Sequence, residues 1–228
     1  MPAVCPCCRG PLPGVNRGLC GVCQSSLVPM AGLRCRTCGG PVDDPVEPCV
    51  SCVAEPALQQ GTVVWGEYDG TLRDAVLTLK HGGHDEVGAV LASRLAGSIS
   101  LEPWAEDITV VTAVPSHPLH RLRRGFNAAE VLARCVACAI DRPFRETLRR
   151  HGLSRQASRS RADRKQLQLR RFSARRTGSI QEQTVLLIDD VITTGTTIKR
   201  AVQALLKGGA LRVYVGAPGF TPDPRRIG

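Results

Sequence analysis

The sequence predicts an α/β protein, in which a parallel sheet flanked by helices follows a small cysteine-rich module. Two observations predict this organisation. Apolar strands followed by a polar loop and a helix recur along residues 62–220, a pattern typical of parallel sheets. Eight of the 11 cysteines form four Cys-x2-Cys pairs near the start of the chain. We therefore expect a double four-cysteine zinc module at residues 1–58 and an α/β domain at residues 62–220.

Composition limits the class of protein. The 228 residues are enough for one sizeable domain and a small one, and 43% hydrophobic residues is ordinary for a globular protein. No apolar run approaches 18 residues, which argues against a transmembrane helix, and the start of the chain lacks the pattern of a secretory signal. We expect a cytoplasmic, reduced protein, where cysteines more often bind metal than form disulfides.

The cysteine pairs repeat with an offset of 30 residues, and in both copies a Gly-Pro turn follows the first pair, at Gly10-Pro11 and at Gly40-Pro41. Two tandem zinc knuckles, each with four thiolate ligands, are the economical interpretation. Interleaved ligand pairing, disulfides and an iron–sulfur cluster remain alternatives. Thr37 replaces Cys7 in the second copy, so we leave Cys7 out of the ligand set. The expected structural zinc ligands are Cys5, Cys8, Cys20, Cys23, Cys35, Cys38, Cys49 and Cys52.

The α/β domain is expected to begin with a strand at residues 63–68. Helices at residues 71–81 and 85–99 follow, separated by Gly82-Gly83. Lys80 lies at the end of the first helix. A lysine there more often complements the helix dipole than binds a ligand, although a phosphate-binding role stays open.

A buried strand is expected at residues 108–114 and ends at Pro115-Ser116. The basic loop that follows carries Arg121 and Arg124 and leads into a helix at residues 128–140. This strand, basic loop and helix could hold an anion at the helix N-terminus. Cys135 and Cys138 form a fifth Cys-x2-Cys pair in this helix, and we interpret them as small core residues.

Residues 142–176 contain 13 Arg or Lys and two acidic residues, a net charge of +11, whereas the whole chain carries +10. The basic charge is therefore concentrated locally. We expect a flexible loop or a partly helical arm. It could be a lid over an anionic substrate, a nucleic-acid patch or simply a solvated basic face.

The stretch from Val185 to Thr197 is the most informative. Four apolar residues predict a strand buried on both faces, and a helix at residues 198–206 and a strand at residues 211–215 follow. The intervening loop offers backbone N–H groups, hydroxyls and the positive end of a helix dipole to a phosphate. The expected phosphate-binding residues are Thr193, Thr194, Gly195, Thr196 and Thr197.

Asp189 and Asp190 stand beside this phosphate loop, where carboxylates would repel an anion. They make sense if they accept hydrogen bonds from ribose hydroxyls or belong to a Mg²⁺ shell that neutralises a second phosphate group. A ribose with a 5′-phosphate on one side and a metal-bound pyrophosphate on the other satisfies both features.

Residues 185–197 resemble the phosphoribosyl pyrophosphate (PRPP) binding motif of the type I phosphoribosyltransferases. With the cysteine module, Tyr68-Asp69-Gly70, Leu79-Lys80 and Arg124-Gly125-Phe126-Asn127, the whole chain resembles the ComF family. The resemblance implies a type I phosphoribosyltransferase-like (Rossmann-like) sheet and PRPP bound with Mg²⁺. It also implies catalytic roles for Asp189 and Asp190. The candidate pyrophosphate-binding residues are Pro115, Ser116, Arg121, Arg124 and Lys80.

Two functions fit this resemblance. The first is a phosphoribosyltransferase that transfers phosphoribosyl to an unknown acceptor and releases pyrophosphate, in a role linked to DNA uptake or nucleotide metabolism. The second is a non-catalytic accessory protein of natural competence that binds PRPP or a nucleotide. Its partners would be single-stranded DNA or a helicase. With 4% aromatic residues the chain offers few stacking platforms, so any DNA binding should be electrostatic.

Overall fold

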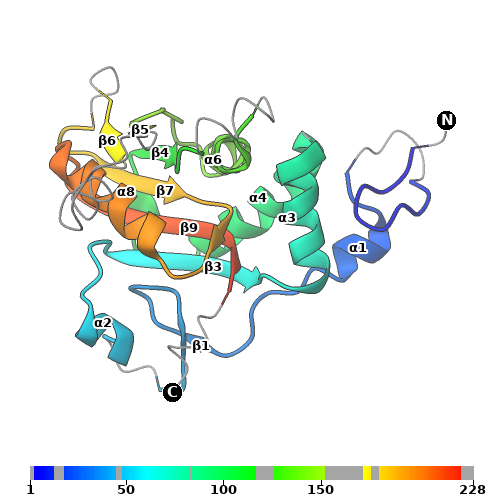
Figure 1. Ribbon diagram of the computed structural model, residues 1–228, viewed down its shortest axis with the longest axis horizontal. Helices are drawn as coiled ribbons and strands as arrows, with labels where there is room; N and C mark the ends of the chain where they lie inside the picture. The colour runs from blue at the N-terminus through cyan, green and yellow to red at the C-terminus, as the bar shows by residue number, and fades with distance from the viewer. Residues whose placement is uncertain are drawn as a thin grey trace, which may run out of the picture.

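The structure is a computed structural model that describes residues 3–12, 18–44, 48–82, 84–116, 126–151, 172–175 and 180–221. Figure 1 shows a central sheet with helices packed around it and cysteine-containing segments at two separate places on its periphery. Across the described ranges, no helix combines the length and apolar character needed to cross a membrane.

The central sheet has five strands, all paired in parallel. Its order is β3–β9–β7–β4, and the short β8 pairs with the end of β9. The strands are β3 (Gly61–Glu67), β4 (Val110–Ala113), β7 (Thr184–Ile188), β8 (Val191–Ile192) and β9 (Arg212–Phe220). Since β4 and β7 are neighbours, their carboxyl ends meet at one edge of the sheet, as the sequence predicts for the two anion-binding loops.

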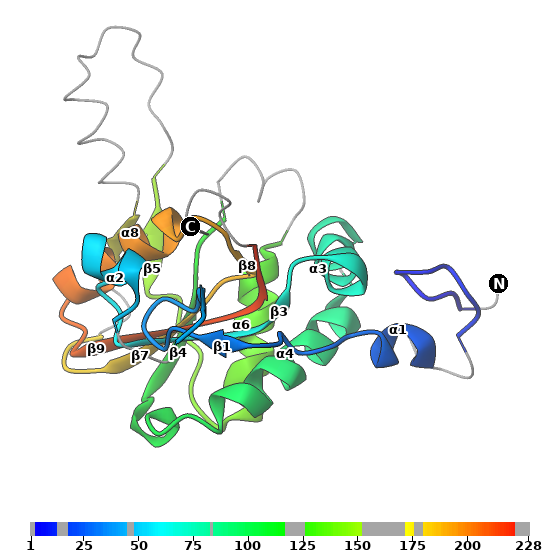
Figure 2. The same ribbon diagram turned by 90° about the horizontal axis from the view of Figure 1, so that it is seen from below.

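Helices cover both faces of the sheet, which explains the uninterrupted apolar run of β7. Leu186 and Ile188 belong to the core formed with α4 (Asp85–Ile99) and α6 (Ala128–Ala139). Val185 and Leu187 belong to the core on the other face, formed with α8 (Thr196–Lys207). Figures 1 and 2 show α8 and the α4–α6 pair on opposite faces. The predicted α/β class and parallel sheet are confirmed.

The elements agree closely with the sequence-based expectations, with three differences. α3 (Gly70–Gly82) and α4 lie where expected, and a 3-10 turn at Ala105–Asp107 precedes β4. The first difference is β8, whose two residues extend the sheet beyond the aspartate pair. The second is that the interpretation of Cys138 as a core residue is wrong. α6 buries the face with Leu132 and Val136, which leaves Cys138 exposed and Cys135 half-buried.

The third difference concerns the Arg-rich segment. Its described ends form an antiparallel pair, β5 (Leu148–Arg150) with β6 (Phe172–Ala174), instead of a loop or a helical arm. Leu148 and Phe172 are buried against the α8 face of the sheet, which accounts for the ordered pairing. Residues 152–171, which contain most of the predicted arm, lie outside the described residues.

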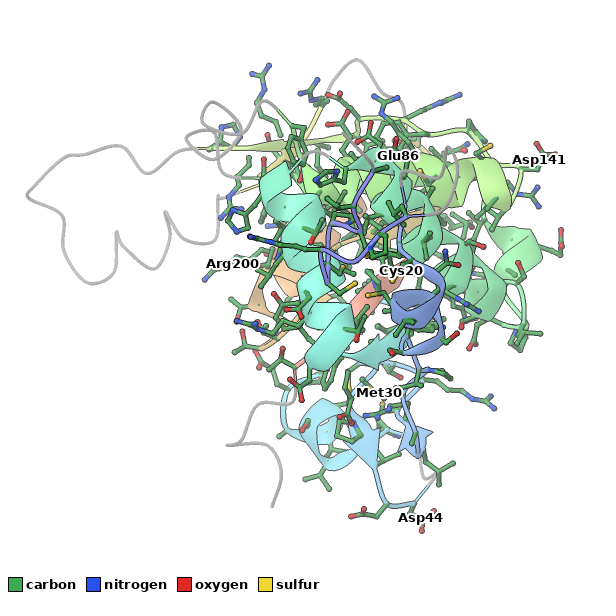
Figure 3. All side chains as sticks on the ribbon, turned by 90° about the vertical axis from the view of Figure 1, so that its right-hand side faces the viewer. Cys20, Met30, Asp44, Glu86, Asp141 and Arg200 are labelled. Atoms are coloured by element: carbon green, nitrogen blue, oxygen red, sulfur yellow. The ribbon has the colours of Figure 1, made fainter. Side chains whose placement is uncertain are left out.

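The cysteine module is not a separate unit but two small lobes that dock at different places. The first lobe contains α1 (Gly21–Ser25) and packs on α3, where the Thr78 hydroxyl donates to the Pro6 carbonyl over 3.3 Å. The second contains β1 (Leu33–Arg34), β2 (Pro41–Val42) and α2 (Val50–Ala54). It docks on the outer edge of β3, where the Thr62 N–H donates to the Arg36 carbonyl over 2.6 Å. Cys20 and Asp44, one from each lobe, lie well apart in Figure 3.

Docking of the second lobe leaves no room at Gly39. A Cβ there would lie 2.7 Å from Val64 Cγ2, and the residue has a φ of +76°. Gly32 has a similar φ of +80°, but a Cβ there would meet nothing within 4 Å. Substitution at Gly32 therefore measures only the cost of placing a side chain on a backbone with positive φ. We expect Gly32→Ala to lower the free energy of unfolding by about 1–2 kcal/mol. Gly39→Ala should lower it by a further 1–3 kcal/mol or so, because Val64 must shift. Denaturant titration of both variants measures the difference, and equal losses would contradict this docking.

Candidate functional site

The aspartate pair lies at the carboxyl edge of the sheet, directly after β7. The Asp189 N–H donates to the Gly216 carbonyl of β9 over 3.0 Å, which fixes the backbone between two strands. Asp190 Oδ1 lies 3.0 Å from Lys80 Nζ, and both side chains are mostly buried. Lys80 also lies 5.9 Å from the centre of the Tyr68 ring. The structure therefore brings Lys80, predicted only as a candidate, to the aspartates from a helix more than 100 positions away in sequence.

The two carboxyl groups do not ionise equally. Burial, reinforced by the neighbouring Asp190 carboxylate, raises the pKa of Asp189 to about 8. The Asp190 N–H, which donates to Asp189 Oδ1 over 2.9 Å, offsets part of this rise, as do the charges of Lys80 and Arg150. The pair therefore carries less than two negative charges near neutral pH, and one of them is paired with Lys80. A site prepared in this way tolerates an approaching anion better than two free carboxylates would.

The raised pKa of Asp189 has a consequence for stability. A carboxyl group with a higher pKa in the folded protein than in the unfolded chain stabilises the fold fully below the unfolded pKa of about 3.9. That contribution is lost as the pH rises through the folded value of about 8. We expect Asp189→Asn, which stays neutral, to raise the free energy of unfolding over wild type by on the order of 2–4 kcal/mol at pH 8.5, and by much less at pH 4. Denaturant titrations at both pH values test this, with exposed Asp44→Asn as the control. A pH-independent difference would contradict it.

The threonine loop connects β8 to α8. Gly195 is the residue before the helix and has a φ of +70°, a conformation that other residues rarely adopt. Gly195 has no side chain that could cap the helix, and the first backbone N–H groups of an α-helix have no intrahelical partner. The hydroxyls of Thr194 and Thr196 lie 3.1 Å apart. These donors and the helix dipole provide the features that a phosphate monoester needs.

The end of β4 provides the second predicted anion site. The side chain of Asn127, at the start of α6, donates to the Val114 carbonyl over 2.9 Å. Ser116 Oγ is buried without a hydrogen-bond partner among the described residues, and Ser116, Pro115 and Asn127 line a cavity of about 140 Å³. Arg121 and Arg124, the predicted cations of this loop, lie outside the described residues.

Sequence reasoning missed Arg150. Its guanidinium donates to the Pro115 carbonyl over 3.3 Å, lies 5.5 Å from the centre of the Phe172 ring and acts electrostatically on Asp189. Within residues 142–176 it is one of 13 cations, and nothing in the sequence distinguishes it. Only the pairing of β5 with β6 places this side chain between the two candidate anion sites.

The eight predicted zinc ligands form two groups of four sulfur atoms, each within 4.8 Å of one another. The closest sulfur pairs are 3.6 and 3.8 Å apart in the first group and 3.7 and 3.9 Å apart in the second. A tetrahedron with 2.3 Å Zn–S bonds has edges of about 3.8 Å, so each group could hold zinc. The groups pair Cys5 and Cys8 with Cys20 and Cys23, and Cys35 and Cys38 with Cys49 and Cys52, which is the tandem arrangement.

Cys7 is not part of either group. Its sulfur lies 3.9 Å from Thr78 Oγ1, and burial raises the pKa of the thiol to about 11. Its exclusion from the ligand set rests on position, because this sulfur lies beside a threonine hydroxyl and outside both groups of four.

Comparison with known proteins places this geometry in context. Residues 121–217 match the family model described as phosphoribosyl transferase domain. The chain is 30% identical to DNA utilization protein YhgH of Salmonella typhi over 94% of this chain and 96% of that protein. It is 26% identical to competence protein ComFC of Bacillus subtilis over 84% and 79% of the two chains. Among solved structures, glutamine PRPP amidotransferase of B. subtilis aligns with 58% of this chain and 26% of its own, at 26% identity and a TM-score of 0.44.

Proposed function

The chain belongs to the ComF family, with relatives such as YhgH and ComFC, and we propose that it binds PRPP and transfers the phosphoribosyl group to an acceptor with release of pyrophosphate. One observation carries this proposal. The Asp189–Asp190 pair follows β7 directly, with Asp190 3.0 Å from Lys80, and it is followed in turn by β8 and the threonine loop, while β4, the neighbour of β7, ends at the same edge of the sheet. Such a site can hold a ribose that bears phosphate groups on both sides.

The roles of the chain's own residues follow from their positions. The threonine loop and the first N–H groups of α8 would bind the 5′-phosphate. Asp189 and Asp190 would accept hydrogen bonds from the ribose hydroxyls and stabilise positive charge that develops at C1′. Carboxylate oxygens are suitable ligands for Mg²⁺, which when bound supplies charge neutralisation for the pyrophosphate.

Pyrophosphate would leave toward the end of β4. The buried hydroxyl of Ser116 and the guanidinium of Arg150 lie on this side. Lys80 would move from Asp190 to a phosphate oxygen once the ribose hydroxyls engage the aspartates. Catalysis would depend on positioning and charge neutralisation, so a Ser–His or Cys–His nucleophile is not required.

Turnover is tested by incubating the protein with PRPP, Mg²⁺ and a panel of purine and pyrimidine bases while pyrophosphate is measured. We expect release that depends on one class of base and falls by about 10²-fold or more in Lys80→Met, since a buried charge partner of the leaving group is lost. Lys207→Met, an exposed lysine at the far end of α8, is the control. If wild type released pyrophosphate no faster than the Lys80→Met variant, and at the same rate with every base, transfer of the phosphoribosyl group would be contradicted.

The two groups of four cysteine sulfurs support a structural role for metal. We infer that each lobe holds one Zn²⁺ through its four cysteines, because the lobes contain too few apolar residues for cores of their own. The first zinc would stabilise the contact with α3, the helix that carries Lys80. The second would stabilise the contact with β3.

An accessory function is the second candidate. In this case PRPP or a nucleotide would be a bound ligand without turnover, and the basic segment at 142–176 would contact single-stranded DNA electrostatically. The net charge of +11 in this segment favours the accessory function, as do the names of the relatives. Binding of PRPP without pyrophosphate release for any base would favour this function over the first.

A further inference from the structure

A second cavity opens off the threonine loop. It has a volume of about 370 Å³, in the range of about 300–1,000 Å³ that is typical of small-molecule sites. Its walls are the start of α8 and the second cysteine lobe, which Figure 2 shows beside each other. Asp189, Asp190 and Lys80 do not line it. The cavity is therefore separate from the ribose site and shares with it only the phosphate-binding loop.

The cavity is held open by specific contacts and is not a loose gap between domains. Lys199 of α8 forms an ion pair with Glu55, the residue that follows α2, with 2.5 Å between Nζ and Oε1. On the floor, Gln59 and Thr62 both donate to the Thr37 carbonyl, over 3.1 and 2.7 Å. These contacts join the lobe to β3 and to α8 on either side of the cavity.

The walls differ in chemical character. The α8 wall carries the hydroxyls of the threonine loop and the positive end of the helix dipole, which favour a phosphate. The apolar surface consists of Phe220, Ile192 and Pro56, which suits a flat ring. The lobe contributes the carboxylate of Glu55, which pairs with Lys199, and the sulfurs of three predicted zinc ligands, Cys38, Cys49 and Cys52. A paired carboxylate and a metal-bound thiolate each keep lone pairs that can accept an N–H of a ligand.

We propose that this cavity binds the base of a nucleoside 5′-monophosphate whose phosphate occupies the threonine loop. The base then lies against the second cysteine lobe, not over Asp189 and Asp190. Because the loop holds one terminal phosphate, this nucleotide and PRPP exclude each other. The inference rests on the proposed use of the loop for the 5′-phosphate of PRPP, and it adds a competing ligand of defined class.

The base position predicts which substitutions discriminate between ligands. Ala57 lines the cavity on the lobe and Gln203 lines it on α8, and neither is near the aspartates. A tryptophan at position 57 would fill the space for the base and leave the loop intact. Gln203→Ala would remove a polar group from the wall, and it should be mild for folding because Gln203 is half-buried and alanine favours a helix.

The test uses isothermal titration calorimetry of the full chain with adenosine 5′-monophosphate (AMP), ribose 5-phosphate and PRPP with Mg²⁺. We expect AMP to compete with PRPP. Ala57→Trp should raise the Kd of AMP at least tenfold, and Gln203→Ala should raise it severalfold. Both variants should keep the Kd values of ribose 5-phosphate and of PRPP within twofold of wild type. Unchanged zinc content and circular dichroism verify that each variant is folded.

The outcomes separate this inference from the function proposed above. Failure of AMP to bind a protein that binds PRPP would overturn the base site. Equal weakening of AMP and PRPP in Ala57→Trp would also overturn it, because the cavity would then belong to the PRPP site. AMP binding that is sensitive to Ala57→Trp, in a protein that does not bind PRPP, would support the base site and reject the PRPP proposal.

Discussion

PRPP with Mg²⁺ is expected to stabilise the wild-type protein against heat, and the double substitution Asp189→Asn, Asp190→Asn should abolish this stabilisation. At a ligand concentration of 100 times Kd, binding adds about 2.7 kcal/mol to the free energy of unfolding. For a protein of this size, that corresponds to an increase in Tm of about 5–10 °C. The variant loses both acceptors for the ribose hydroxyls and the oxygen ligands for Mg²⁺, so its Tm should change by less than about 1 °C.

A matched control exists within the chain. Asp43 and Asp44 are also adjacent aspartates, and both are exposed in the second cysteine lobe. Their double substitution to Asn changes the net charge by the same amount but should leave the full increase in Tm. Because Asp189→Asn stabilises the ligand-free protein at alkaline pH, each variant is compared with its own ligand-free Tm. If PRPP with Mg²⁺ raised the Tm of the Asp189→Asn, Asp190→Asn variant as much as that of wild type, the aspartates would not belong to the binding site. If it did not raise the Tm of wild type, PRPP binding itself would be rejected.

Local sequence was sufficient for the α/β class, the positions of the main helices and the choice of the eight cysteines that form the two groups. The apolar run of β7 and the glycine before α8 specify their elements without reference to the rest of the chain. Each Cys-x2-Cys turn presents two sulfurs, so the sequence also indicates eight ligands, but it leaves tandem and interleaved pairing open, and the tandem arrangement is seen only in the structure.

Features that depend on tertiary packing could not be predicted in the same way. Lys80 reaches Asp190 only because α3 packs on the edge of the sheet, and Arg150 reaches Pro115 only because β5 pairs with β6. The cysteine region is one repeat in sequence, yet its two lobes dock on α3 and on β3. That difference arises from single residues, such as the hydroxyl of Thr78 and the missing side chain of Gly39, which show no sequence pattern of their own. The assignment of catalytic and phosphate-binding residues stays a prediction for the experiments above.

Removal of zinc is expected to have the largest effect on the fold, and the effect should differ between the two lobes. Structural zinc sites in small peptides contribute about 10–16 kcal/mol at neutral pH, comparable to the total stability of a domain, about 5–15 kcal/mol. We expect two Zn²⁺ per chain by elemental analysis, and one each in Cys5→Ser and Cys52→Ser. Cys138→Ser, an exposed cysteine outside both groups, should keep two.

Hydrogen exchange distinguishes the lobes by their docking partners. Cys52→Ser should accelerate exchange of the Thr62 N–H, which donates to the Arg36 carbonyl over 2.6 Å, because the second lobe no longer covers the edge of β3. Cys5→Ser should leave that amide protected and instead accelerate exchange along α3, where the first lobe packs around Thr78. Since α3 carries Lys80, Cys5→Ser should also weaken PRPP binding. Two variants with the same exchange pattern would show that the lobes act as one unit, contrary to their separate docking.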